Sequence, residues 1–144
     1  MANIDLRKGA ANGYPASGSK GLYALEALLD FEKDPRVATN VLELLDIPKG
    51  SMILGTKVEV IRAEGGTATA HLGLHDAAMS AVDADGFLAS TDLNAAAGTV
   101  AVSKDGGAAY ADTDVGVTAA HILTMTLGHD MDYGQYRIRA FVLG

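Results

Sequence analysis

Apolar and polar residues alternate most clearly between Ile47 and Leu74. The apolar residues stand at every second position except 56: Met52, Leu54, Val58 and Val60. Lys57 and Glu59 lie between them, and a period of two is typical of a strand with one buried face. Glu64-Gly65-Gly66 predicts a tight turn, and alternation resumes from Thr67 to Leu72. The pattern therefore predicts a β-hairpin whose apolar set is buried and whose Lys57 and Glu59 lie in water.

Two segments before this stretch fit either a strand or a helix. Tyr23, Leu25, Ala27, Leu29 and Phe31 alternate as in a strand, but Leu22, Leu25 and Leu29 would also share one helical face. The segment from Val37 to Leu45 has the same ambiguity. We predict strands for both, because the hairpin needs partners to complete its sheet.

After Leu74 the pattern weakens and then returns. His75 to Gly98 is rich in Ala, Asp and Ser, and predicts a long excursion with at most a short strand near Phe87-Leu88. Four further strands are predicted: Val100 to Val102, part of Ala108 to Thr118, His121 to Gly128, and Gln135 to Leu143. A hairpin turn is predicted at Asp105-Gly106-Gly107. Short strands with frequent turn signals predict an all-β chain, folded as an antiparallel β-sandwich or barrel.

The first 21 residues differ from the rest. They contain four glycines, one proline and two serines, and they show no apolar periodicity. We expect a flexible N-terminal arm over residues 1–21 and a β-sandwich domain over residues 22–144. Such a segment is a tail in a monomer, whereas in an assembly it can order against a partner.

Charge and composition narrow the function classes. The net charge of −7 argues against nucleic-acid binding, and seven aspartates against one lysine give the segment from Asp76 to Asp114 a charge of −6. The arm has a local charge of +2. No cysteine is present, so thiolate chemistry is excluded. We expect no membrane span and synthesis in the cytoplasm, because no long apolar run or signal-peptide pattern occurs.

Candidate chemistry is sparse. His71 and His75 would be too far apart on a strand to share a metal ion, and His121 and His129 lie at opposite ends of a predicted strand, so all four are predicted to be surface or turn residues. Asp83-Ala84-Asp85-Gly86 resembles only the start of a calcium loop, which leaves a weak calcium site open. No nucleophile or phosphate-loop context is present. We therefore expect no catalytic residues, no cofactor and no enzyme.

Basic and aromatic residues supply the candidate contacts with a partner. Arg137 and Arg139 should project from one face of the last strand, where they could bind an anionic partner or simply form the solvated face of a sheet. The full set of candidate partner-binding residues is Arg7, Lys8, Tyr14, Lys20, Arg137 and Arg139.

Several turn and strand motifs together resemble a known group of proteins. The motifs are LDIPKG at Leu45 to Gly50, EGGTAT at Glu64 to Thr69, DGFL at Asp85 to Leu88, YAD at Tyr110 to Asp112, and RAFVL at Arg139 to Leu143. From about Leu22 to the C-terminus the chain resembles small virion structural proteins of tailed bacteriophages, which are β-sandwich or jelly-roll proteins that decorate or cement the head. The resemblance implies a non-enzymatic homo-oligomer, with a trimer favoured, on the exterior of a capsid and bound to the major capsid protein.

The competing interpretation is a carbohydrate-binding module or a small β-barrel enzyme, because a fold does not decide a function. A sugar site needs an exposed aromatic platform, and the five tyrosines are scattered along the chain, which weakens that alternative.

Overall fold

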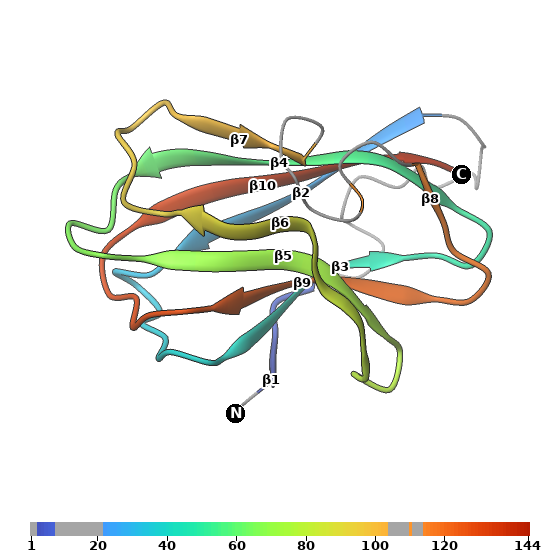
Figure 1. The fold of residues 1–144 in the computed structure, drawn as a ribbon, viewed down its shortest axis with the longest axis horizontal. Coiled ribbons are helices and arrows are strands. Elements are labelled where there is room, and N and C mark those ends of the chain that lie inside the picture. Colours follow the sequence, from blue (N-terminus) through green and yellow to red (C-terminus); the bar gives the residue numbers. More distant parts are fainter. Residues whose placement is uncertain (1–2, 8–21, 104–109, 111–113) are drawn as a thin grey trace.

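The chain folds as two facing β-sheets, which a computed structural model describes for residues 3–7, 22–103, 110 and 114–144 (Figure 1). Ten strands are assigned within these residues: β1 (Asn3–Asp5), β2 (Leu22–Asp30), β3 (Val41–Ile47), β4 (Met52–Arg62), β5 (Thr69–Asp76), β6 (Ala81–Asp92), β7 (Val100–Val102), β8 (Val115–Gly116), β9 (His121–Leu127) and β10 (Gln135–Leu143). Sheet A has the order β1-β3-β9-β5-β6, and sheet B the order β2-β10-β4-β7 with β8 also paired to β4. The all-β prediction is confirmed.

The core lies between the sheets and consists mainly of aliphatic side chains. On β10, Tyr136, Ile138, Ala140 and Val142 are fully buried, on the face opposite the one from which Arg137 and Arg139 were predicted to project. The Tyr136 ring packs against Phe31 with centroids 5.9 Å apart, and its hydroxyl donates to the Leu93 carbonyl. The rest of the core is mostly Leu, Val, Ile and Ala, with Phe87, Met125 and Met131 among them.

Both ambiguous segments near the N-terminus are strands. β2 pairs with β10 along nine consecutive residue pairs without a register shift, and β3 pairs with β9. In β2 the residues alternate between the core and the outer surface, with Leu25 and Leu29 inside and Leu28 outside. Tertiary pairing with the C-terminal strand therefore outweighs the helical propensity of Leu, Ala and Glu.

The predicted hairpin between Met52 and Leu72 is wrong, although both of its strands exist. β4 belongs to sheet B and β5 to sheet A, so the turn at Glu64-Gly65-Gly66 connects the two layers. Each strand pairs with a strand far away in sequence: β4 with β10, and β5 with β9. Period-two alternation reports a half-buried strand but does not identify its neighbour.

The register predicted for β4 holds over only half of the strand. Val58 and Val60 are buried, with Lys57 and Glu59 half-buried on the other face, but Met52 is exposed and Ile53 is buried in its place. The pairing with β10 shifts between Phe141 and Val142, which face Gly55 and Ile53. The extra residue is a β-bulge, which reverses the phase of the alternation.

The segment after Leu74 was expected to hold at most a short strand, and this was also wrong. β6 spans twelve residues and pairs with β5 through three register shifts. Its first half runs so close to β5 that a side chain at Gly73 would clash with the backbone of Asp83 and Ala84. These irregularities explain the missing alternation. The predicted turn at Asp105-Gly106-Gly107 lies outside the described residues.

The N-terminal residues contribute to the sandwich. Asn3–Asp5 form β1, which runs parallel to β3, and the N–H of Leu6 donates to the Glu43 carbonyl at 2.8 Å. An arm without regular structure was expected here, so this part of the expectation is corrected. Residues 8–21 lie outside the described part, and the boundary at residue 21 stays a prediction.

Candidate interaction surface

The outward side chains of sheet B form a broad surface around the two predicted arginines. The register places Arg139 between Glu26 of β2 and Lys57 of β4, and Arg137 between Leu28 and Glu59. Leu22, Leu143 and Met52 lie side by side at one end of the sheet, and Val100 of β7 faces Glu59. We call this surface the outer face of sheet B.

The charges on this face largely neutralise one another. The Arg139 guanidinium donates to Glu26 at 2.9 Å, and Arg137 contacts Glu59 at 3.3 Å and Glu26 at 3.6 Å. Lys57 lies over the ring of Phe141, 5.5 Å from its centroid. Three cations and two carboxylates leave this face a net charge of +1 in a chain of −7. Cross-strand pairs of this kind stabilise a solvated sheet face by small amounts.

Large apolar side chains are unusually exposed on the same face. Leu22 is 64% exposed, Leu28 50%, Leu143 46%, Val100 45% and Met52 39%. Single exposed apolar residues are ordinary, but a gathering on one side of a sheet marks an interaction surface.

A second charged cluster lies on the other sheet, where Arg7 contacts three carboxylates at the edge of sheet A. Its guanidinium contacts Asp5 at 2.8 Å, Asp46 at 2.7 Å and Glu43 at 3.1 Å. The Glu43 side chain is only 10% exposed, so Arg7 neutralises a largely buried carboxylate. Hydrogen bonds from Arg7 lower the pKa of Asp5 to about 2, and the bonds to Asp5 and Asp46 raise the pKa of Arg7. Arg7 thus holds β1 against β3.

The structure places the six candidate partner-binding residues in three groups. Arg137 and Arg139 lie together on the outer face of sheet B, where glutamates of the neighbouring strands bind them. Arg7 is occupied by carboxylates at the edge of sheet A. Lys8, Tyr14 and Lys20 lie outside the described residues. Whether any of the six contacts a partner remains a proposal.

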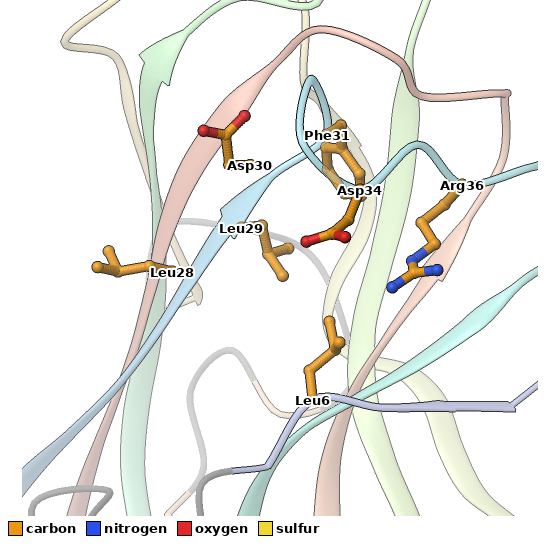
Figure 2. A pocket seen from close by; sticks show the side chains of 7 residues that line it. All are labelled: Leu6, Leu28, Leu29, Asp30, Phe31, Asp34 and Arg36. Atoms are coloured by element: carbon orange, nitrogen blue, oxygen red, sulfur yellow. The ribbon is translucent and has the colours of Figure 1, made fainter.

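A small pocket opens between the N-terminal residues and the end of β2 (Figure 2). Its volume is about 180 Å³, and it is lined by Leu6, Leu28, Leu29, Asp30, Phe31, Asp34 and Arg36. Asp30 is bound by Arg62 at 3.1 Å. Ligand pockets usually enclose about 300–1,000 Å³, so this pocket is below that range, and its position beside the edge strand β2 is its main feature.

One histidine departs from the sequence prediction. His75 is buried, and its Nδ1 lies 2.8 Å from the hydroxyl of Thr124, which is itself fully buried. Burial lowers the pKa of His75, against smaller opposing effects of Asp76 and Glu43. The expected surface position is therefore wrong for His75, because the first half of β6 folds over this part of sheet A.

The described residues contain no group of three or more His, Cys, Asp or Glu side chains arranged to hold a metal ion. Burial, followed by interaction with Asp85, raises the pKa of Asp83. Such a shift indicates two carboxyl groups that interact directly.

Sequence reasoning missed the structural role of Glu64. Its carboxylate accepts the N–H groups of Asp132 and Gly134, each at 2.6 Å, and of Tyr133 at 3.2 Å. Burial alone would raise the pKa of Glu64, but these donors outweigh it and lower the pKa. An acid beside two glycines gave only a turn signal, since the N–H donors that bind it come from a loop about 70 residues away.

The described tyrosines do not form a platform. Tyr136 is buried, and Tyr110 packs edge-on against Phe87 with centroids 5.0 Å apart. Tyr133 is exposed and stacks with Arg62, whose guanidinium carbon lies 4.5 Å from the ring centroid.

Among the described residues, no helix is long and apolar enough to cross a membrane.

Comparison with solved structures finds the same fold in chains from phage capsids. A chain from the capsid of Ralstonia phage GP4 superposes with a TM-score of 0.67 at 13% identity, covering 97% of both chains. A chain from the acid-stable capsid of Helicobacter pylori bacteriophage KHP30 gives 0.60 at 15% identity, covering 86% of this chain and 88% of the other. A chain from the capsid asymmetric unit of cyanophage Pam1 gives 0.58 at 14% identity, with 90% and 89% covered. At 13–15% sequence identity, the similarity shows that these chains share a fold and nothing beyond it.

No protein-family model matches the chain, and no curated protein matches it by sequence.

Proposed function

We propose that the chain is a non-enzymatic structural protein of a bacteriophage virion that decorates or cements the exterior of the capsid. The observation that carries the proposal is the fold likeness to chains from three phage capsids, which extends over 86–97% of this chain. The match also covers 88–97% of each capsid chain, so the likeness extends over the whole sandwich rather than over one part of it.

The proposed partners are the major capsid protein and further copies of this chain. The outer face of sheet B supports a contact role, because it combines exposed leucines with charges that are already paired. Interfaces of this type bury apolar side chains at their centre and keep charged residues at the rim. A homotrimer is the proposed assembly, because closed symmetry is the rule for homo-oligomers and a threefold matches the local threefolds of an icosahedral shell.

The distribution of charge supports the proposed position on the capsid exterior. The acidic residues between Asp76 and Asp114 would face solvent and keep particles apart, whereas the basic residues near the N-terminus would face an acidic shell. Arg137 and Arg139 would lie in the contact through the outer face of sheet B, where the net charge is +1.

The test is the protein content of density-purified virions from the phage that encodes the chain. Quantitative mass spectrometry should find the chain at a fixed ratio to the major capsid protein, and cryo-electron microscopy should place the sandwich outside the shell. A chain found only in the infected-cell lysate would contradict the virion role. Density on the inner side of the shell would contradict the decorating role alone.

A further inference from the structure

The free edge of β2 is the longest regular strand edge in the described structure. Sheet edges present unpaired N–H and C=O groups, and proteins usually protect them by shortness, bulges, charge or proline. β1 and β7 have three residues each, and β6 is interrupted by three register shifts. β2, by contrast, has nine residues, no register shift against β10, and no proline, glycine or lysine.

The side of β2 that is available for pairing can be assigned from one hydrogen bond. The N–H of Phe31 donates to the Gly134 carbonyl at 2.9 Å, next to the pair of Asp30 and Gln135. Backbone groups alternate in direction along an antiparallel strand. The even-numbered residues of β2, such as Ala24 and Glu26, therefore direct their N–H and C=O groups away from β10.

The even-numbered residues also carry the exposed side chains. Leu22 and Leu28 are 64% and 50% exposed, and they lie on the outer face of sheet B together with Glu26. Figure 2 shows Leu28 pointing to the opposite side of β2 from Leu29. A regular edge strand with two exposed leucines is a template for another strand.

We infer that β2 pairs antiparallel with β2 of a second copy of the chain, about a twofold axis at Leu25. In this register Leu22 lies opposite Leu28 of the second copy, and Ala24 opposite Glu26, so each exposed leucine faces another. These pairs exchange both N–H···O bonds, because their backbone groups face the free edge. The two copies of sheet B then form one continuous sheet.

The neighbouring registers are less favourable. A twofold at Glu26 would place Glu26 against Glu26 and Leu22 against Asp30, and like charges directly opposite one another destabilise a pair of strands. Shifting the axis to Ala24 places Leu22 opposite Glu26, and shifting it to Ala27 places Leu28 opposite Glu26, so in both registers neither leucine faces another leucine. Self-complementarity is thus satisfied best at Leu25, which favours a second copy over an unrelated partner. This contact is independent of the virion role and of a threefold elsewhere on the chain.

The first test is the mass of the full-length chain in solution by analytical ultracentrifugation. Ala24→Pro removes an N–H that faces the free edge, so it should block the added strand while leaving the bonds to β10 intact. Leu28→Lys places a charge in the same contact. The wild type should sediment with at least twice the mass of either variant. Val82→Lys, which changes an exposed valine on β6, is the matched control and should retain the wild-type mass.

The second test fixes the register through disulfide formation in a chain that has no cysteine of its own. Cysteines at directly opposite positions are close enough to bond. A mixture of Leu22→Cys and Leu28→Cys chains should therefore cross-link much faster than either variant alone, and faster than Val82→Cys. Equal masses of wild type, Ala24→Pro and Leu28→Lys would overturn the inferred contact, as would rapid cross-linking of Glu26→Cys with itself.

Discussion

At the scale of single residues, Glu64 connects two loops that are far apart in sequence. One buried carboxylate satisfies the backbone N–H groups of Asp132, Tyr133 and Gly134. Charge-assisted hydrogen bonds of this type are stronger than those between neutral groups. The short connection between the sheets therefore depends on an acid that looks like an ordinary turn residue.

Replacing Glu64 with Gln tests this role. The amide removes the charge and turns one acceptor into a donor that faces other donors, so we expect the free energy of unfolding to fall by about 2–3 kcal/mol. Glu59→Gln is the matched control, since Glu59 is half-exposed and its contact with Arg137 should contribute less than about 1 kcal/mol. Urea unfolding measures both variants, and equal losses would contradict a special role for Glu64.

His75 makes stability depend on pH. Burial lowers the pKa of His75 below the ordinary histidine value of 6.5, so the unfolded chain binds a proton more readily than the folded one. The contribution of His75 to stability is complete above pH 6.5 and is lost as the pH falls through the lower folded pKa. Thermal unfolding between pH 8 and pH 5 should show this loss in the wild type and a smaller loss in His75→Gln. Parallel profiles for the two proteins would contradict the assignment.

At the scale of elements, β1 joins the N-terminus to sheet A through three paired residues and Arg7. β1 is too short to hold its position by backbone bonds alone. Arg7 adds contacts to Asp5, Asp46 and the nearly buried Glu43, so removal of its guanidinium leaves a poorly solvated carboxylate.

Arg7→Ala should therefore lower the free energy of unfolding by about 1–2 kcal/mol, because Glu43 loses its partner. Hydrogen exchange should also become faster at the N–H of Leu6, which donates to the Glu43 carbonyl. Lys33→Ala, a change at an exposed lysine in the turn after β2, should alter neither quantity measurably. Unchanged exchange at Leu6 in Arg7→Ala would show that the ion pairs do not hold β1.

The elements themselves could be predicted more reliably than their partners. Alternation located β9 and β10 and gave the buried set of β10, since a residue's face depends on its local spacing. The same pattern assigned β4 and β5 to one hairpin, although β4 pairs with β10 and β5 with β9, and all of these residue pairs are at least 45 positions apart. Local spacing carries no information on such distant partners.

Irregular strands were the other source of error. The bulge at Leu54 reverses the face of Met52 and Ile53, and the three register shifts in β6 remove its alternation altogether. Of the candidate contact residues, the positions of Arg137 and Arg139 on a shared face could be predicted. Their glutamate partners on β2 and β4 could not, since these depend on strand order.

At the scale of the whole molecule, strands from the two halves of the chain pair with each other in both sheets. N-terminal β2 lies beside C-terminal β10 in sheet B, and β3 lies beside β9 in sheet A (Figure 1). Long-range pairing of this kind ties both ends of the chain into the sandwich. It also leaves β1, with Arg7 just after it, beside β3 at the edge of sheet A.

The ion pairs of Arg7 change how the positive charge of the arm can act on a capsid. Arg7 already binds three carboxylates of the chain, which leaves Lys8 and Lys20 as the basic residues of the arm that could attract an acidic shell. Deleting the whole arm would also remove β1, and would confuse loss of attraction with loss of stability. Substituting only the two lysines separates these effects.

The double variant Lys8→Ala, Lys20→Ala should bind undecorated capsids more weakly than the wild type at low salt. The difference should shrink toward 1 M salt, where the Debye length falls to about 3 Å. Thermal stability should stay within about 0.5 kcal/mol of the wild type. The matched control is Lys33→Ala, Lys49→Ala, which removes the same charge from exposed positions outside the arm. Co-sedimentation with capsids across a salt series measures both variants. Equal weakening of the two would mean that net charge governs the attraction, and unchanged binding of the arm variant would place the contact on the sandwich.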